Sequence, residues 1–183
     1  MKTAEEIVDQ LLLLLESAGS YSYDGEAVSQ LEHALQCAEL ARSAHSDGET
    51  VVASLLHDIG HLVEASRPHG ELGVIDHAAC GAQYLRELGF PAKVVDLVAA
   101  HVAAKRYLVA IDAAYAARLS PTSQRTLELQ GGPMSAEEQA AFAADPLKIE
   151  KVRLRSWDES AKRPGHPCAG LASYRSLLLS VLG

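Results

Sequence analysis

Apolar residues recur along most of the chain at spacings of three and four positions, which is the period of one face of an α-helix. The first such stripe runs from Ile7 to Leu15. It follows a capping-box pair, Thr3 and Glu6, and predicts a helix that ends at about Ser17. Similar stripes predict further helices over about 27–45, 49–63, 76–88, 91–101, 109–118, 122–129 and 171–182.

Polar stretches that contain glycine or proline separate these stripes. Residues 18–26 and 64–75 have this composition and predict loops. Between the later stripes, Ser135 and Glu138 form a second capping box, and Asp145 with the following proline marks another helix start. No segment alternates apolar and polar residues with a period of two, so we predict an all-α fold.

The composition fits one folded domain spanning residues 1–183. Hydrophobic residues make up 48% of the chain and charged residues 22%, which is typical of globular proteins and wrong for a disordered chain. The formal net charge of −8 argues against a nucleic-acid partner, because a grip on phosphates needs a basic surface. It does not exclude a small anionic substrate, since a local group of cations outweighs the global charge at short range.

We also expect a soluble, cytoplasmic protein with no membrane partner. The apolar run from Leu11 to Leu15 is far shorter than the roughly 20 residues that cross a bilayer, and the first residues lack the pattern of a signal peptide. The cysteines are too few and too scattered for a disulfide framework, which suits a reducing compartment: Cys37, Cys80 and Cys168.

An ionisable pair, His57-Asp58, lies inside the apolar stretch from Val51 to Ile59. Burying such a pair is costly unless something compensates the charge. A metal ion would do so, because imidazole offers a neutral nitrogen and the carboxylate offers negative charge. The alternative is a hydrogen-bonded His–Asp pair at a helix kink, and the dipeptide taken alone favours that alternative.

Four further residues change this interpretation. His33 lies on a helical stripe, His77 begins a predicted helix, His101 ends one, and Asp158 lies on a late helix. Each histidine alone is more often a satisfied core or capping residue, but such a set on successive helices is difficult to attribute to chance. Helical bundles build metal sites from inward-facing histidines and carboxylates. We therefore predict a metal site in the core of the bundle.

The order His, His-Asp, His, His, Asp resembles the HD-domain superfamily in its dinuclear form. Six protein ligands exceed those of a tetrahedral zinc ion but suit two six-coordinate ions that share the Asp58 carboxylate. Mixed imidazole and carboxylate ligands suit iron or manganese as well as zinc. His61 and His57 have the spacing of the zinc-protease HExxH motif. However, Asp58 stands where that motif has glutamate, and no third ligand has the motif's spacing. We therefore discard the metalloprotease interpretation.

The ligand set does not select a reaction, since dinuclear HD phosphodiesterases and diiron oxygenases share it. Longer stretches, which define a motif-bearing core over about 23–159, are similar to the phosphonate-degrading, PhnZ-type HD oxygenases. These stretches are Tyr23-Asp24-Gly25-Glu26 with Gln30 to Ala38, His101 to Val109, Leu119 to Met134 with its Gln130-Gly131-Gly132-Pro133 segment, and Arg155 to Glu159.

This resemblance implies a mixed-valent diiron centre, Fe(II)/Fe(III), that uses O2 to cleave the carbon–phosphorus bond of a small 1-hydroxyphosphonate. The products would be phosphate and a carboxylic acid. That acid is glycine from 2-amino-1-hydroxyethylphosphonate, or glycine betaine from its trimethylated analogue. One iron would take His33, His57 and Asp158, the other His77 and His101, and Asp58 would bridge them.

The resemblance also implies a phosphonate-binding set: His61, Lys105, Ser123, Thr126 and Arg155. The residue chemistry agrees with this role. An arginine fork hydrogen-bonds two oxygens at once, a lysine adds a point charge, and hydroxyls three positions apart on a helix share one face. Without the resemblance, each would be read as a surface base or a helix-end hydroxyl.

Tyr23 and Glu26 match a loop in which the tyrosine occupies an iron position until substrate displaces it and the glutamate meets the substrate's amino group. Such a loop would gate the reactive centre. The alternative is an ordinary surface loop.

Two other functions remain for an HD domain of this kind. One is a metal-dependent phosphohydrolase that acts on a phosphate ester or nucleotide, where the same centre would activate water. The other is a catalytically silent domain that senses a small anion. The absence of a lost ligand position and of an attached output domain speaks against the silent domain.

Overall fold

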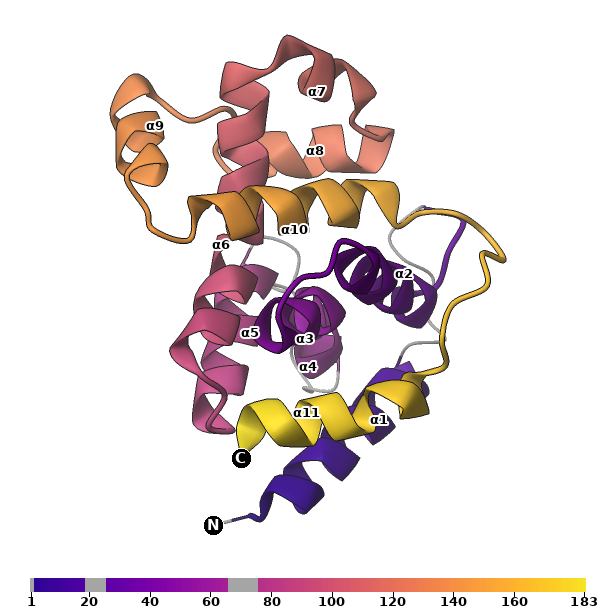
Figure 1. The fold of residues 1–183 in the computed structure, drawn as a ribbon. Helices are drawn as coiled ribbons and strands as arrows, with labels where there is room; N and C mark the ends of the chain where they lie inside the picture. The colour runs from indigo at the N-terminus through magenta and orange to yellow at the C-terminus, as the bar shows by residue number, and fades with distance from the viewer. Residues whose placement is uncertain (1, 19–25, 66–75) are drawn as a thin grey trace.

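The computed structural model of the chain describes residues 2–18, 26–65 and 76–183. Within these ranges all regular elements are helical, which confirms the predicted all-α fold (Figure 1). They are α1 (Ala4–Ala18), α2 (Gln30–Ser43), α3 (Gly48–Leu56), α4 (Ile59–Ala65), α5 (His77–Glu87), α6 (Ala92–Ile111), α7 (Ala113–Arg118), α8 (Pro121–Leu129), α9 (Ala136–Ala143), α10 (Lys148–Ser160), a 3-10 turn η1 (Leu171–Tyr174) and α11 (Arg175–Leu182).

The long helix α6 organises the bundle. It contacts α3, α5 and α10, while α2 lies against α3 and α10. Helices α1 and α11 pack together at one end, where both termini lie, and α7, α8 and α9 lie at the other end (Figure 1). The main core is lined by fully buried aliphatic side chains such as Leu11, Leu56 and Leu97. Each contributes roughly 1.5–3 kcal/mol by leaving water.

Two helix starts follow the predicted capping chemistry. The hydroxyl of Thr3 accepts the backbone N–H of Glu6, whose carboxylate accepts the N–H of Thr3. Ser135 and Glu138 make the same reciprocal pair at the start of α9. Each cap satisfies backbone donors that the first helical turn leaves without partners.

The prediction that one helix ends at about 101 and another begins at 109 is wrong. Helix α6 continues unbroken through His101 to Ile111. Its apolar side chains face different partners in its two halves: Val94 and Leu97 belong to the main core, whereas Tyr107 packs on a separate cluster with Phe142. A change of apolar face within one helix looks like two helices in the sequence pattern.

The predicted helix over 49–63 is interrupted at its centre. Helix α3 ends at Leu56, α4 begins at Ile59, and His57 and Asp58 form the turn between them. The backbone N–H of His61 bonds the carbonyl of Asp58 at 3.0 Å, so α4 restarts directly from the turn. Because of this turn, the side chains of His57 and Asp58 reach the same buried space. In a continuous helix, two adjacent side chains would point about 100° apart.

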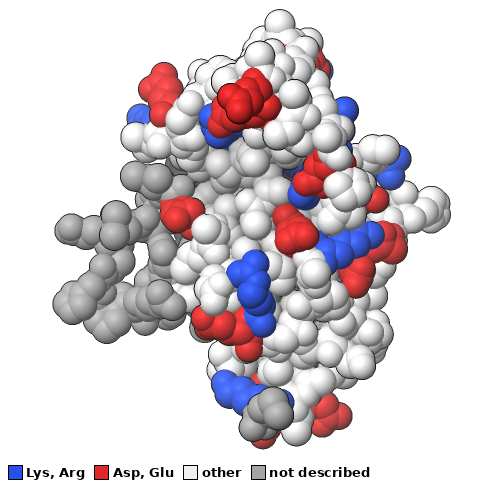
Figure 2. Space-filling model, turned by 90° about the vertical axis from the view of Figure 1, so that its left-hand side faces the viewer, with Lys and Arg blue, Asp and Glu red and all other residues white. Residues whose placement is uncertain are grey.

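Charged side chains of both signs are interspersed on the face drawn in Figure 2, without a continuous basic area. Among the helices in the described part of the chain, none combines the length and the apolar character that a bilayer span requires.

Candidate metal centre and the adjoining pocket

The bundle brings all six predicted ligands together in its interior. His33 comes from α2, His57 and Asp58 from the turn after α3, and His77 from the first turn of α5. His101 comes from the middle of α6 and Asp158 from α10. None is more than 7% exposed: His33, His57, Asp58, His77, His101 and Asp158.

Helices α2 and α10 and the turn form what we call the first ligand group, which consists of His33, His57, Asp158 and one oxygen of Asp58. The Nε2 atoms of His33 and His57 lie 3.1 Å apart. Oδ1 of Asp158 lies 3.3 Å from the Nε2 of His33 and 3.8 Å from that of His57. Oδ2 of Asp58 lies 3.3 Å from His57 Nε2 and 3.7 Å from His33 Nε2.

The second ligand group consists of His77, His101 and the other oxygen of Asp58. The Nε2 atoms of His77 and His101 lie 2.8 Å apart. Oδ1 of Asp58 lies 3.5 Å from the first and 3.4 Å from the second. Asp58 therefore directs one carboxylate oxygen to each group, as a bridging ligand does.

The imidazole tautomers leave nitrogen lone pairs facing one another. Nδ1 of His33 donates to the carbonyl of Ala161 at 2.8 Å, and Nδ1 of His57 donates to that of Ser54 at 2.9 Å. Nδ1 of His101 bonds the Val98 carbonyl at 2.7 Å in the same way. A neutral imidazole that donates through Nδ1 has an acceptor at Nε2. Two acceptors 3.1 Å apart repel each other unless a cation lies between them.

The carboxylates show the same need for positive charge. Oδ2 of Asp58 and Oδ1 of Asp158 are buried and accept no hydrogen bond from the described residues. An unsatisfied buried carboxylate oxygen is costly, and a coordinated cation removes that cost. Burial raises the pKa of both aspartates, but neighbouring groups, His57 for Asp58 and Arg155 for Asp158, leave each pKa well below its usual range. The residues present therefore fit a pair of divalent or trivalent metal ions.

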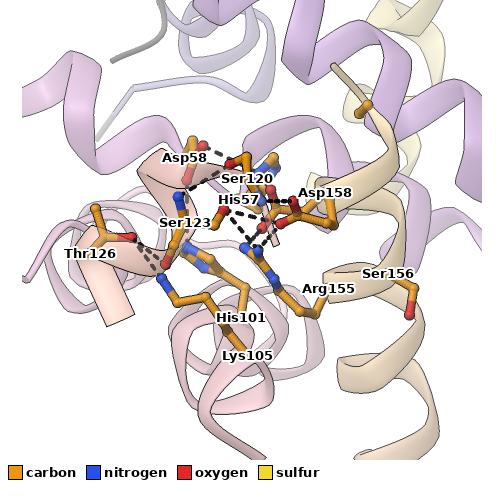
Figure 3. Close-up of polar contacts among 12 residues, drawn as sticks. His57, Asp58, His101, Lys105, Ser120, Ser123, Thr126, Arg155, Ser156 and Asp158 are labelled. Atoms are coloured by element: carbon orange, nitrogen blue, oxygen red, sulfur yellow. Dashed lines mark hydrogen bonds and ion pairs between the residues drawn. The ribbon is translucent and has the colours of Figure 1, made fainter. Parts of the chain in front are cut away.

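Arg155 holds the outer oxygen of Asp158. Its Nη1 donates to Asp158 Oδ2, and its Nη2 contacts Glu159 Oε2. Its Nε donates to the hydroxyl of Tyr115 at 2.8 Å, and Nη2 lies 3.3 Å from Ser123 Oγ. Figure 3 shows the guanidinium directed at Asp158. This leaves Oδ1 of Asp158 to face the histidines.

A pocket opens beside the second ligand group. Its walls include Asp58, His77, His101 and Asp158, together with the predicted phosphonate-binding set and several residues that were not predicted. Those further residues are Val102, Thr122, Gln130 and Lys162.

The predicted phosphonate-binding residues all line this pocket: His61, Lys105, Ser123, Thr126 and Arg155. The His61 ring stacks on His77 with centroids 4.0 Å apart. Lys105 is buried and donates to Thr126 Oγ1 at 2.9 Å, as Figure 3 shows. Burial, and then the charge of Arg155, lowers the pKa of Lys105 to about 8.

Glu26 also lines the pocket, whereas Tyr23 lies outside the described residues. The Glu26 carboxylate accepts from Ser120 Oγ at 2.7 Å and from Lys162 Nζ at 3.1 Å. Burial raises the pKa of Glu26, but these two donors outweigh it and leave the pKa lowered.

Sequence reasoning missed Lys162, which follows the last predicted ligand by four positions. Its ammonium group also bonds Ser123 Oγ at 3.1 Å and Glu159 Oε1 at 3.3 Å, so it joins the segment before α2 to α8 and α10 around the pocket. No periodicity marked it, because it lies past the end of α10 in an irregular segment. Gln130 carried a usable signal, since it lies seven positions after Ser123 on the same helical face.

Comparison with known proteins agrees with this geometry. Residues 31–148 match the family described as HD domain. The chain is 41% identical over 184 residues to a hydroxymethylphosphonate dioxygenase of Gimesia maris, covering 99% of this chain and 90% of that protein. It is 40% identical over 162 residues to a 1-hydroxy-2-(trimethylamino)ethylphosphonate dioxygenase (glycine-betaine-forming) of Leisingera caerulea, covering 86% and 81%.

An uncharacterized protein of Acanthamoeba polyphaga mimivirus is 36% identical over 178 residues, covering 96% of this chain and 81% of that protein. The family match takes in five of the six clustered residues, and the near full-length relatives extend it to the sixth, Asp158. The chain therefore belongs to the HD-domain family and groups there with the phosphonate dioxygenases.

Proposed function

We propose that this protein is an O2-dependent oxygenase that cleaves the carbon–phosphorus bond of a small 1-hydroxyphosphonate at a diiron centre. The observation that carries the proposal is the arrangement of two ligand groups that share Asp58 and open on a pocket with buried cationic groups. Two named relatives, both phosphonate dioxygenases, support the reaction class.

The metal ions would be held as the two ligand groups suggest. His33, His57 and Asp158 would hold one iron, His77 and His101 the other, and Asp58 would bridge them. Mixed imidazole and carboxylate ligands suit iron. When bound, a mixed-valent Fe(II)/Fe(III) pair would supply the redox chemistry that O2 activation needs. That chemistry is not available to zinc.

The pocket residues account for binding of the phosphonate. Lys105 and Thr126 already share a hydrogen bond, so the ammonium and the hydroxyl are oriented toward the same anion. Ser123 adds a second hydroxyl on that face of α8, and His61 is held in place by its stacking on His77. Charge-assisted hydrogen bonds of this kind are about twice as strong as neutral ones.

Arg155 has a different principal role in this arrangement. Its guanidinium is engaged by Asp158, Glu159 and Tyr115, so it orients a metal ligand while one edge faces the pocket. Partners that orient a metal ligand change metal affinity by about 10- to 100-fold when they are removed.

The overall reaction balances without an external reductant. A 1-hydroxyphosphonate and one O2 contain the atoms of one carboxylate and one phosphate, and the electrons released on breaking the C–P and C–H bonds reduce the O2. Glycine would be the carboxylate from 2-amino-1-hydroxyethylphosphonate. Formate would come from hydroxymethylphosphonate and glycine betaine from the trimethylated substrate.

Glu26, at the pocket wall, would meet a substrate ammonium group once its contact with Lys162 opens, and Tyr23 would gate the iron site. The variant Tyr23→Phe tests the gate. If Tyr23 binds iron in the resting enzyme, the variant changes the optical spectrum of the substrate-free iron protein. An unchanged spectrum would contradict that role.

The proposed function itself is tested by phosphate release from iron-loaded protein. Protein with Fe(II) and ascorbate is given each of the three hydroxyphosphonates under air and under nitrogen, with Asp58→Asn as the control for free-iron chemistry. Release that requires both O2 and Asp58 supports the proposal. Equal release under nitrogen, or release only from phosphate esters, would contradict it and favour a phosphohydrolase.

A further inference from the structure

Helices α4 and α5 touch through their backbones at two glycines, Gly60 and Gly81. A Cβ atom built on Gly60 would lie 1.9 Å from the carbonyl oxygen of His77 and 2.9 Å from the backbone nitrogen of Gly81. A Cβ on Gly81 would lie 3.0 Å from the backbone nitrogen of Gly60 and 3.1 Å from Cγ2 of Ile59. The atoms in the way are mostly backbone, which cannot rotate aside.

Neither glycine is needed for its backbone conformation. The positive-φ glycines in the described residues are Gly89, Gly131, Gly132 and Gly165. Gly60 and Gly81 lie inside helices, where glycine costs about 1 kcal/mol relative to alanine. Their presence is therefore explained by the close approach of the two helices.

The contact lies next to the second ligand group. Gly60 follows Asp58 by two positions, and the atom that its Cβ would strike belongs to His77 itself. His61, the next residue on α4, stacks on the His77 ring. The distance between α4 and α5 thus sets how far His77 lies from Asp58, which is now 3.5 Å between Nε2 and Oδ1.

The first ligand group does not depend on this contact. Apart from the shared Asp58, its residues come from α2, the turn directly after α3 and α10, and the hydrogen bonds that hold its imidazoles run to Ala161 and Ser54. A shift of α5 away from α4 would move His77 and leave His33, His57 and Asp158 in place.

We propose that the Gly60–Gly81 contact is the positioning element that makes the centre dinuclear. A methyl group at Gly60 cannot be accommodated without separating α4 from α5, which withdraws His77 and leaves a protein that binds one metal ion; a methyl group at Gly81 requires a shift of a few tenths of an ångström, which weakens the second site. This rests on the proposed function only in that both ligand groups bind metal; it does not depend on the substrate or on the reaction.

The test compares metal stoichiometry and affinity in four variants with the wild type. Gly60→Ala carries the severe clash and Gly81→Ala the milder one. His77→Ala removes the second-group ligand directly, and Gly170→Ala is the matched control. A Cβ at Gly170 has no neighbour within 4 Å, and its φ of −63° suits alanine.

Each protein is loaded with Mn(II), dialysed and assayed by mass spectrometry and electron paramagnetic resonance. The wild type and Gly170→Ala should hold two ions per chain with the spectrum of a coupled pair. Gly60→Ala should hold one ion with the six-line spectrum of isolated Mn(II), as in His77→Ala. Gly81→Ala, whose clash is milder, should bind its second ion at least tenfold more weakly than the wild type.

Two results would overturn the proposal. One is a Gly81→Ala protein that holds two ions with wild-type affinity. The other is a folded Gly81→Ala protein that loses both ions, because the contact would then support the whole centre. If Gly60→Ala does not fold, the second-site affinity of Gly81→Ala decides the test. The ion that Gly81→Ala retains at its first site shows that this variant is folded. Failure of the proposed oxygenase function is a separate result, since it appears as absent phosphate release from a wild type that still holds two ions.

Discussion

The two ligand groups differ in how the protein surrounds them. His33 and His57 of the first group are fully buried and hydrogen-bonded to backbone carbonyls, and Asp158 is held from behind by Arg155. Both histidines of the second group, His77 and His101, line the pocket, whereas the first group reaches it only through Asp158 and the shared Asp58. The first group offers two histidines and two carboxylates, and the second two histidines and one carboxylate. The second group therefore leaves more positions for external ligands.

Because of this difference, the two ligand groups suit different roles. An enclosed, charge-rich group favours tight binding of an ion, whereas an open group with fewer protein ligands favours exchange of water for substrate atoms. The pocket cations lie on the open side, where Lys105 and Thr126 are already joined. Substitutions that act on both groups, on the enclosed group or on the open side alone therefore separate the two roles.

The largest effect is expected at Asp58, which the two groups share. Asp58→Ala removes an oxygen from each group, so both metal affinities should fall by more than the roughly 100-fold that loss of an indirect partner causes. Isothermal titration with Mn(II) measures both sites, and phosphate release from a hydroxyphosphonate should be lost in parallel. Asp96→Asn, an exposed aspartate on α6, serves as the control. One site retained at wild-type affinity would show that Asp58 does not bridge.

Arg155 should affect the enclosed group alone. Arg155→Met removes the donor that orients Asp158, so affinity at the first site should fall about 10- to 100-fold. The second site, which has no contact with Asp158 among those described, should keep its affinity. Arg153→Met alters an exposed arginine on the same helix and should leave both sites unchanged. Equal weakening of both sites would mean that Arg155 supports the whole bundle and does not act through Asp158.

Lys105 should give the open side its pH dependence. Its pKa is about 8, so the ammonium charge is present below that pH and is lost as the pH rises through it. For a dianionic substrate, kcat/KM should then fall up to tenfold per pH unit above about 8. In Lys105→Arg the guanidinium stays charged, and the fall should disappear. If kcat/KM of Lys105→Arg still falls above about pH 8 as in the wild type, the titrating group is not Lys105. Lys93→Arg, a lysine-to-arginine change elsewhere, serves as the control.

The sequence predicted the helical bundle and the six clustered residues for different reasons. Burial on one helix face leaves a periodic record, so α1, α2 and α5 follow from apolar spacing. His57 and Asp58 stood out because an ionisable pair inside an apolar run needs a partner. The continuity of α6 was not predictable from its pattern, because Leu97 and Tyr107 face different clusters.

Pocket residues outside regular elements were harder to predict. Lys162 is placed by the chain's path after α10, and its four polar partners come from Glu26, Ser120, Ser123 and Glu159. Three of these lie in segments far from it or in another helix, so no local pattern identifies the group. A lysine in an irregular segment has the same sequence signature whether it faces solvent or a pocket.

The smallest expected effect is at Gln130, on the open side. Its Oε1 is buried, lines the pocket and has no hydrogen-bond partner among the described residues. An unsatisfied buried acceptor costs about 1–3 kcal/mol, so Gln130→Leu should leave the thermal midpoint unchanged or raise it slightly. If the substrate's hydroxyl or ammonium satisfies this oxygen, the same variant should raise KM several-fold with kcat nearly constant. Gln124→Leu, an exposed glutamine on α8, should leave KM unchanged. An unchanged KM in Gln130→Leu would show that Gln130 does not bind the substrate, which would leave Lys105 and Thr126 beside it as the recognition residues.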